Sequence, residues 1–569
     1  MPSYISNLTQ LRTMFLYSND FIGTIELNNL LSKLPHLIAL DVSSNSGLVV
    51  VDGEDNSSMA SFPKIHYLCL LGCNIVKFPG FLRYQNKIVL LNLSYNKMHG
   101  AIPKWAWETW NNNGHTSFLF LDNNEFTSSG YSLYLPVQGV GILDLSNNML
   151  EGPIPIPQGS ASVLDYSNNM FSSIPSHFSS HLSDVTIFMA SGNNFTGNFL
   201  SSFCGTTNIQ LLDLSYNKFS GSIPSCLMQN ANSLQSLNLN QNQFHGELPD
   251  NIKEGCLFEA LDFSSNWIEG KLPRSLVACK NLVILDVGNN QISDSFPCWM
   301  SKLTKLEILV LKSNKFFGQV AQPPQEEKSA CTFPSLTIID LSSNNFFDRL
   351  PHDHWFENLK SMISRDPSKS LVMDHEFPNM LRTYKYTTTV TYKGQTMTFP
   401  QILTTLVFID FSNNMFNATI PEAVGVLDLL VGLNMSHNSL TGPIPSQLSH
   451  LTQLEALDLS SSELYGEIPL DLKTLDALTV LNLSNNKLVG SIPESPHFMT
   501  FSNSSFLGND GLCGLPLSKL CINTPPSNAE SHQSERKYVD IFLFLFAGLG
   551  FGVGFAIVAA WGIPTRKQS

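Results

Sequence analysis

Aspartates recur at one position of a repeated segment, and carboxylates are the groups from which acid–base pairs and cation sites are built. Each aspartate stands between two apolar residues of a short segment: Asp144, Asp213, Asp262, Asp286, Asp340, Asp410 and Asp458. If the segment is a strand, the apolar side chains point inward and the aspartates form a column on the other face. The repeat favours Asp or Asn at this position throughout, so a catalytic pair would be a coincidence. We expect the column to favour basic or hydroxyl-rich ligands, with Asp340 and Asp410 among the contacts.

Other catalytic chemistry has little support. The sequence contains no His-Glu-x-x-His, no Gly-x-Ser-x-Gly, no phosphate loop and no kinase signature. His352-Asp353-His354 could hint at a metal, but a polar start to an inserted segment explains it better. The net charge of −14 gives no electrostatic reason to bind nucleic acid. The sequence therefore predicts no enzyme, no cofactor and no metal.

The elements that position the aspartates come from a unit that recurs about every 24 residues from Leu11 to Pro493. One copy reads Leu234-x-x-Leu237-Asn238-Leu239-x-x-Asn242-x-Phe244-x-Gly246-x-Leu248-Pro249. We anchor eighteen copies at Met14, Leu40, Leu68, Leu91, Leu119, Leu143, Leu164, Phe188, Leu212, Leu237, Leu261, Leu285, Leu309, Ile339, Ile409, Leu433, Leu457 and Leu481. One copy cannot bury its apolar residues alone, whereas stacked copies can, so the pattern predicts a solenoid with a concave face.

Within each copy an Asn is expected to turn the chain after the strand, because its amide can satisfy backbone groups that the turn leaves open. Cys73 and Ser462 replace this Asn, and we expect a weaker coil at Ser462. The Gly-x-Ile-Pro that follows Asn-x-Leu resembles the plant-type extracellular leucine-rich repeat, from Leu11 to about Cys521. The resemblance implies an α/β-type repeat solenoid. It would be a superhelix with short parallel strands on the concave face, a second small sheet, and one C-terminal transmembrane helix.

The array is interrupted once at length, since Ile339 and Ile409 are 70 residues apart. The insertion is similar to the island of plant receptor-like proteins, in which Tyr-Lys-Gly recurs, and the alternation from Tyr384 to Tyr392 predicts one β-strand. A bulge without order is the alternative. We expect the island to clamp a ligand on the concave strands of the C-terminal half. The proposed contacts are Trp355, Tyr384, Tyr386, Tyr392 and Lys393. A second, polar insertion spans 321–334 and receives no function.

Ten cysteines indicate an oxidising compartment. Neighbouring coils lie about 5 Å apart, close enough for a disulfide between cysteines one repeat apart. On that ground Cys204 and Cys226, and Cys256 and Cys279, are candidate staples. Cys298 and Cys331 could close the small insertion, while Cys69 and Cys73 are expected to be free thiols, with a zinc site as the alternative. The segment around Cys513 and Cys521 resembles the family's C-terminal cap, and the resemblance implies that these two pair.

Sequons for N-glycosylation support the same compartment. Asn194, Asn417 and Asn503 are the better candidates, with Asn7 and Asn56 as further ones. Asn92, Asn434 and Asn482 lie inside the strand phrase, where the repeat itself generates sequons by chance.

Residues 541–563 carry no charge and are long enough to cross a bilayer. Small residues at Gly548, Gly552 and Ala556, and at Gly550 and Gly554, form a predicted helix-association face, although glycine is simply common in membrane spans. The predicted organisation is repeats 1–351, island 352–405, repeats 406–493, cap 494–522, linker 523–540, membrane span 541–563 and a short cytoplasmic tail 564–569.

The first residues contain no signal peptide and no N-terminal cap, which departs from the family. We interpret the chain as a truncated receptor. The alternative is a complete chain inserted tail-first, which would leave the sequons without a purpose.

The chain thus resembles a plant receptor-like protein of the disease-resistance type, without a kinase. The resemblance implies a single-pass type I protein of the plasma membrane that perceives a peptide, protein or glycan outside the cell. It would signal through an adaptor receptor-like kinase, bound through the membrane span, and a SERK-type co-receptor kinase that faces coils 433–493. The alternatives are a co-receptor for a developmental peptide hormone, a polygalacturonase-inhibitor-like protein, and a non-functional fragment.

Overall fold

The computed structural model describes residues 5, 7–52, 62–110, 117–131, 133–175, 178–198, 200–229, 232–321, 331–368, 370–375 and 384–521. Contacts divide the chain into one compact unit, Met1–Lys519, and a second, Leu520–Ser569. Only the first two residues of the second unit are described, so the account that follows concerns the first. The predicted membrane span, its Gly548, Gly550, Gly552, Gly554 and Ala556, and Asn56 lie outside the described residues.

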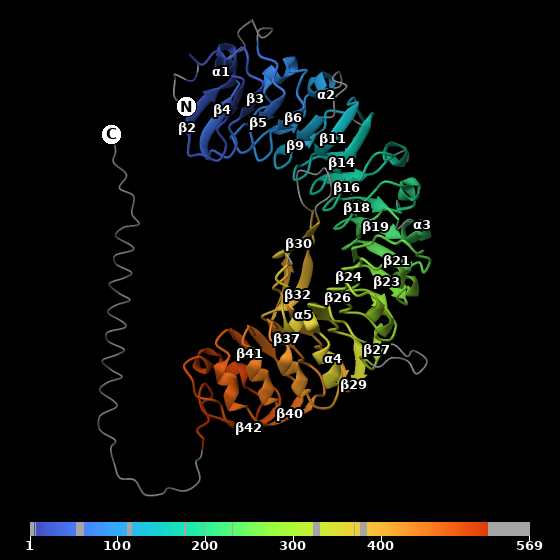
Figure 1. The fold of residues 1–569 in the computed structure, drawn as a ribbon, viewed down its shortest axis with the longest axis vertical. Coiled ribbons are helices and arrows are strands. Elements are labelled where there is room, and N and C mark those ends of the chain that lie inside the picture. Colours follow the sequence, from blue (N-terminus) through green and yellow to red (C-terminus); the bar gives the residue numbers. More distant parts are fainter. Residues whose placement is uncertain are drawn as a thin grey trace, which may run out of the picture. The chain divides into compact units, whose positions relative to one another are not determined.

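The predicted solenoid is confirmed in the described residues by one 18-stranded parallel sheet (Figure 1). Its strands are β1 (Thr13–Phe15), β3 (Ala39–Asp41), β5 (Tyr67–Cys69), β6 (Leu90–Asn92), β8 (Ser117–Phe120), β11 (Gly139–Asp144), β14 (Ser160–Asp165), β16 (Ile187–Met189), β18 (Leu211–Asp213), β20 (Ser236–Asn238), β22 (Ala260–Asp262), β24 (Ile284–Asp286), β26 (Ile308–Val310), β28 (Ile338–Asp340), β35 (Phe408–Asp410), β37 (Gly432–Asn434), β39 (Ala456–Asp458) and β41 (Val480–Asn482). Each anchor residue pairs with the next anchor in register, from Met14↔Leu40 to Leu457↔Leu481. Hence residues at one repeat position form a straight row across the sheet.

Buried asparagines join each coil to its neighbours. Asn266 is typical: its Nδ2 donates to the carbonyl oxygens of Leu239, Phe263 and Ser264 at 2.9–3.1 Å, and its Oδ1 accepts from the amide of Phe244 at 3.0 Å. Every polar atom of this side chain is therefore used, as a buried amide requires. The expected weakness at Ser462 has a visible cause, because its buried Oγ has no hydrogen-bond partner.

Phenylalanines two residues after the asparagines stack along the core. Phe195 and Phe219 lie 5.6 Å apart with their rings 13° from parallel, and Phe346 and Phe416 stack at 6.3 Å. In-register strands place identical side chains one strand spacing apart, which suits offset stacking of aromatic rings.

The return segments form the second set of small parallel sheets that the resemblance implied. Four of these sheets have two strands each: β2 (Ile22–Glu26) with β4 (Gly47–Val51), β7 (His99–Ala101) with β9 (Glu125–Ser128), β10 (Tyr134–Leu135) with β13 (Ile156–Pro157), and β12 (Glu151–Pro153) with β15 (Met170–Ser173). One has five strands in the order β17 (Thr196–Gly197), β19 (Lys218–Gly221), β21 (Gln243–Glu247), β23 (Trp267–Gly270) and β25 (Gln291–Ile292). The last two consist of β27 (Phe317–Gly318), β29 (Asn345–Asp348) and β36 (Met415–Phe416), and of β38 (Thr441–Gly442), β40 (Glu463–Glu467), β42 (Lys487–Ser491) and β43 (Gly511–Cys513).

Short helical turns complete the coils. Proline commonly precedes them, as Pro273 does before the 3₁₀ turn Arg274–Ala278, because its fixed φ suits the first helical position. The α-helices are α1 (Leu27–Lys33), α2 (Lys104–Trp110), α3 (Ser225–Gln229), α4 (Asp353–Glu357) and α5 (Lys360–Ile363). None of the described helices is both long and apolar enough to span a bilayer.

The island folds on the inner side of the curved sheet (Figure 1). Its strands are β30 (Val372–His375), β31 (Tyr384–Lys385), β32 (Thr388–Tyr392), β33 (Gln395–Phe399) and β34 (Ile402–Leu403). The prediction of one strand from Tyr384 to Tyr392 is wrong, because β31 pairs with β30 whereas β32 pairs with β33. The Tyr-Lys-Gly phrase is the tip of the β32–β33 hairpin. Lys393 and Gly394 have φ of 54° and 75°, as a two-residue type I′ turn requires.

The segment after the last repeat covers the end of the array. β43 pairs with β42, and Phe506 and Leu512 are completely buried. Asn509 continues the asparagine ladder by donating to the carbonyl of Leu483 at 2.9 Å. The last coil therefore does not expose its apolar core to water.

Candidate functional site

Two rows of side chains run along the concave sheet, one on either side of the anchors. The residue before each anchor lies in what we term the apolar row, which includes Phe118, Ile142, Val163, Ile187, Leu211, Ala260, Ile284, Ile308, Ile338 and Phe408. The residue after each anchor lies in what we term the carboxylate row, whose aspartates are Asp41, Asp144, Asp165, Asp213, Asp262, Asp286, Asp340, Asp410 and Asp458. Sequence reasoning found most of the second row and overlooked the first. The sequence did contain evidence for the apolar row, because a position exposed to solvent would not be apolar in so many copies of the repeat.

Most aspartates of the carboxylate row already have a structural task. In Asp144, Asp213 and Asp340 one oxygen accepts the amide two residues on and the hydroxyl of a serine at that position, at 2.6–3.0 Å. The carboxylate thereby stabilises the turn that leaves the strand. This explains why the repeat prefers Asp or Asn here, and it argues against a catalytic reading.

The island covers the part of the rows where we expected a ligand to dock. Met373, Val390 and Ile402 of the island pack with Ala260, Ile284, Ile308, Ile338 and Phe408 of the apolar row in one buried cluster. Asp340 and Asp410 beneath it are completely buried. The expectation that these two aspartates contact a ligand is therefore wrong for this conformation, because no part of either is open to solvent.

Polar contacts hold the island at both ends. The hydroxyl of Tyr384 donates to Asp213 Oδ2 at 3.0 Å. At the other end the Tyr392 hydroxyl donates to Glu455, and Lys393 Nζ lies 2.9 Å from Glu455 Oε2. Tyr384 and Tyr392, which we had expected to contact a ligand, therefore contact the solenoid.

Lys312 joins the solenoid to the middle of the island. Its Nζ lies 3.7 Å from Asp340 Oδ2 and donates to the carbonyl of Thr389 in β32. Sequence reasoning missed this residue, although a lysine at a position usually occupied by serine, as in Ser264 and Ser342, was a detectable signal.

Burial raises the pKa of the carboxylate row. It brings the pKa of Asp410 to about 7, with the charge of Asp340 adding to the effect, and that of Asp165 and Asp262 to about 6. The pKa values of Asp286 and Asp340 are raised for the same reason. A carboxylate that loses water is harder to ionise, and its neighbours in the row repel a second charge.

Beside the island lies a cavity of about 680 Å³ on the concave face. We term it the concave cavity. Its floor comes from both rows on β8, β11, β14, β16 and β18, and its wall from the island: Phe120, Ile142, Asp144, Val163, Asp165, Met189, Leu211, Tyr384, Lys385 and Pro400, with Tyr95, Asn147 and Asn168 at the turns. The volume is that of a typical site for a small molecule or for a few residues of a peptide.

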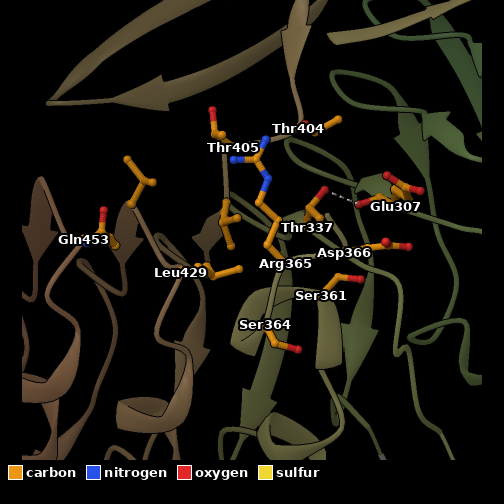
Figure 2. A pocket seen from close by; sticks show the side chains of 12 residues that line it. Glu307, Thr337, Ser361, Ser364, Arg365, Asp366, Thr404, Thr405, Leu429 and Gln453 are labelled. Atoms are coloured by element: carbon orange, nitrogen blue, oxygen red, sulfur yellow. Dashed lines mark hydrogen bonds between the residues drawn. The ribbon is translucent and has the colours of Figure 1, made fainter. Parts of the chain in front are cut away.

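A smaller cavity of about 200 Å³ opens on the flank where the island leaves the array (Figure 2). Arg365 extends across it toward Thr404 and Thr405, and the hydroxyl of Thr337 donates to the carbonyl of Glu307 at 3.2 Å. Glu307 and Asp366 oppose the charge of Arg365, so the lining favours no single ligand charge.

The remaining aromatic candidates are not available to a ligand. Trp355 is 2% exposed and packs on Phe356 at 5.2 Å, so the expectation of a ligand contact there is wrong. Its position in α4 places it in the core rather than in the island. Tyr386 packs edge-on against Tyr384 at 5.5 Å, within the contact between island and solenoid.

The structure joins Cys204 to Cys226, Cys256 to Cys279 and Cys298 to Cys331. Cys513 and Cys521 are also disulfide-bonded, whereas Cys69 and Cys73 are free thiols. Burial raises the pKa of both free thiols to about 12, which leaves them unreactive. Among the described residues, no cluster of His, Cys, Asp or Glu has the geometry of a metal site.

Comparison with known proteins places this architecture. The Leucine Rich Repeat model matches residues 208–230, 233–254, 281–303, 429–451 and 477–499. Receptor like protein 27 of Arabidopsis thaliana is 39% identical over 562 residues, and Receptor-like protein 54 of the same plant is 38% identical over 566. These alignments cover 98% and 97% of this chain. Over nearly its whole length the chain is similar to leucine-rich-repeat receptor-like proteins. It spans 65% of the length of each of these two relatives and 39% of Receptor-like protein 35, to which it is 34% identical.

Solved structures share the fold of this chain. The ectodomain of the Arabidopsis receptor kinase HAESA, in complex with an extended IDA peptide hormone, superposes with a TM-score of 0.67 at 26% identity. The match covers 92% of this chain and 78% of that one. HAESA in complex with IDA and the co-receptor SERK1 superposes with a TM-score of 0.63 at 26% identity, over 90% of this chain and 76% of that one.

Proposed function

We propose that the chain recognises an extracellular ligand in the concave cavity and signals through partner receptor kinases at the plasma membrane. The observation that carries the proposal is the concave cavity itself, which has a volume of about 680 Å³ and is lined by both the sheet and the island. It lies on the concave side of an array that receptor-like proteins share. The related ectodomain of HAESA binds a peptide hormone. These facts support recognition rather than catalysis.

The location differs from the one that the sequence suggested. A ligand on the C-terminal half would have to displace the island, which forms a buried apolar cluster of ten residues together with the sheet there. A ligand in the concave cavity would instead contact the island from its side, at Tyr384 and Lys385. In this arrangement the island forms one wall of a preformed site.

Signal transfer is the second part of the proposal. The uncharged residues 541–563 would anchor the chain in the membrane and pair with an adaptor receptor-like kinase. Coils 433–493 would face a SERK-type co-receptor, since HAESA assembles with SERK1. A role in plant defence is our first choice. Recognition of a developmental peptide is the second, and the peptide hormone bound by HAESA favours it.

The test separates the cavity from the rest of the concave face. Val163→Trp fills the cavity floor, whereas Leu90→Trp adds the same bulk at the same repeat position of β6, outside the lining. Each full chain is expressed in leaf cells, which are then treated either with pathogen extract or with a secreted-peptide fraction of plant tissue. Association with a SERK-type kinase is measured by co-purification.

We expect treatment-dependent association for the unchanged chain and for Leu90→Trp, and none for Val163→Trp. The fraction that triggers association distinguishes defence from development. If Val163→Trp responds like the unchanged chain, the cavity is not the recognition site. If association is constant with or without treatment, the receptor proposal itself fails. Deleting residues 355–400 would not be informative, because it removes the core residues Trp355 and Phe356 and exposes the apolar row.

A further inference from the structure

One of the small sheets carries apolar side chains on its outer face where earlier coils carry polar ones. The position directly follows the buried apolar residue of each return segment. In the four coils before β27 it is polar: Ser220, His245, Glu269 and Ser293. In β27 it is Phe317 and in β29 Phe347, which are 47% and 46% exposed. Met415 of β36 lies opposite Phe347 and is 50% exposed. We term these three side chains the apolar patch.

A glycosylation sequon lies beside the apolar patch and on the same face. Asn417 directly follows β36, at the repeat position that the two phenylalanines occupy in their own coils. Its amide donates to the carbonyl of Asp348 at 2.7 Å, which continues the pairing of β36 with β29. Met415 and Asn417 are exposed and flank the buried Phe416, so the alternation of the strand turns both outward.

The apolar patch lies within reach of the first sugars of a glycan on Asn417. Met415 is two residues away along the strand, which is about 7 Å. Phe347 is one strand spacing across from Met415, so it lies about 8 Å from Asn417 on the diagonal. An N-glycan begins with N-acetylglucosamine linked to a second N-acetylglucosamine, and this unit is longer than either distance.

The chemistry of these sugars matches the apolar patch. One face of a pyranose ring presents C–H bonds, which are apolar and slightly positive, whereas the face of a phenyl ring is slightly negative. Stacking the two faces removes apolar surface of both from water. The acetyl group adds a methyl group that can contact a thioether, which is soft and adaptable. A phenylalanine and a methionine beside the attachment point are therefore suitable contacts for the sugar.

From these observations we infer that the N-glycan on Asn417 lies on the apolar patch and covers it, with its first sugars against Met415 and Phe347. The glycan thereby closes this flank of the array to other proteins. The inference rests on the extracellular location in the proposed function, because N-glycans are added to secreted chains. It adds the surface that this modification occupies and its role there.

Oxidation of methionine tests the cover, because peroxide oxidises accessible thioethers fastest. The full chain is purified from leaf cells in detergent and treated with dilute hydrogen peroxide. The reaction is quenched, the peptides are deglycosylated, and mass spectrometry gives both the oxidation rate of Met415 and the glycan occupancy of Asn417. Met170 is the internal reference, since it is also 50% exposed and also follows an asparagine of the ladder.

We expect Met415 to oxidise several-fold faster when the sequon is removed by Asn417→Gln or by Thr419→Ala, while Met170 is unchanged. Phe347→Ser should also accelerate the oxidation, although Asn417 stays glycosylated, because the sugar loses the ring on which it stacks. Phe347→Tyr retains the ring and should have no effect. In the Asn417→Gln background Phe347→Ser should add little, since both substitutions remove the same contact.

Equal oxidation of Met415 with and without the sequon would overturn the inference, as would additive effects of Asn417→Gln and Phe347→Ser. Protection that persists in Asn417→Gln and grows with protein concentration would assign the cover to a second copy of the chain instead. Occupancy separates this failure from that of the proposed function. A bare Asn417 beside glycosylated Asn194 and Asn503 overturns the inference alone, whereas three bare asparagines overturn the extracellular location as well.

Discussion

At the scale of single residues, one amide per coil decides whether the array holds together. The asparagine side chain of a complete coil makes four hydrogen bonds within the core, as Asn266 does, whereas the hydroxyl of Ser462 makes none. A buried polar group that loses its partners costs more than the bond contributed, because water cannot reach the groups left behind. The coils should therefore differ in stability according to this one side chain.

Two substitutions of opposite sign test this. Asn266→Ala should lower the free energy of unfolding by about 2–3 kcal/mol, because three carbonyls and one amide lose their partner. Ser462→Asn should raise it by about 1 kcal/mol by completing the ladder. Urea titration followed by circular dichroism measures both. Gln291→Ala, an exposed residue, serves as the control. An unchanged midpoint for Asn266→Ala would contradict the role given to the ladder.

At the scale of elements, the island is held mainly by apolar burial and only weakly by its ion pair. Val390 is completely buried against the apolar row, whereas the side chains of Lys393 and Glu455 are 33% and 41% exposed. Truncating a buried valine costs about 2 kcal/mol, and an exposed ion pair contributes about 0–1 kcal/mol. The hydrophobic contact should therefore dominate the docking.

Trypsin can report this difference, because Lys393 lies at the tip of the hairpin. Val390→Ala should accelerate cleavage after Lys393 by about tenfold, since the hairpin must leave the sheet before the protease can bind it. Glu455→Gln should change the rate by less than about threefold. Faster cleavage in Glu455→Gln than in Val390→Ala would show that the polar contact holds the island.

Docking of the island should also depend on pH. The pKa of Asp410 is raised to about 7 by burial, and those of Asp286 and Asp340 are raised as well, with Lys312 as the facing cation. A carboxyl group whose pKa is higher in the docked state favours docking when protonated. Docking is therefore strongest below about pH 4 and weakens, by up to about tenfold per pH unit for each group, until about pH 7. The Lys393–Glu455 contact acts in the opposite direction, because the pKa of Glu455 is lowered, but its exposure makes it the smaller effect.

Hydrogen exchange at β32 and β33, corrected for the intrinsic rate, measures the docking. Protection should fall as the pH rises from 4.5 to 7.5, and Asp410→Asn should flatten the curve. Constant protection over this range would rule out the ionisation of these aspartates as the cause.

The strands of the repeats and the strands of the island differ in how far the sequence predicts them. The register of all eighteen strands follows from the spacing of the anchors, because the period fixes each residue within its coil. The island has no period. Its contact between Tyr384 and Asp213 joins residues 171 positions apart, and alternation alone does not say which surface a strand will meet. The apolar residues before the anchors would have predicted where the island docks, because an exposed row of apolar side chains on the concave face is stabilised when another segment buries it.

At the scale of the whole array, the turns and the concave sheet differ in whether their asparagines can carry a glycan. Asn194, Asn417 and Asn503 are exposed on turns, whereas Asn92, Asn434 and Asn482 are half-buried on the concave sheet. The Nδ2 of Asn434 donates to Asp410 at 3.2 Å and that of Asn482 to Asp458 at 3.1 Å. A glycan on the concave residues would replace these bonds and would collide with the neighbouring coils.

We therefore expect glycans on the turns and none on the concave sheet. Enzymatic deglycosylation in heavy-oxygen water, followed by peptide mass spectrometry, marks each occupied asparagine. Asn194, Asn417 and Asn503 should carry the label, and Asn434 and Asn482 should not. A label on Asn434 would mean that the island and its row are open when the chain meets the glycosylation machinery.

Through its contacts with Asp213 and Glu455, the island bridges two distant coils of the curved sheet. Nine strands, from β18 to β39, lie between its two attachment points, a path of about 38 Å along the sheet. The segment from Tyr384 to Tyr392 can extend only about 27 Å. The curvature of the sheet and the length of the two tyrosine side chains make up the difference, so the length of this segment matches the number of coils between its attachment points. The island therefore couples two lengths in evolution: a gene that gained or lost one coil between these points would need a longer or shorter island to keep both ends attached.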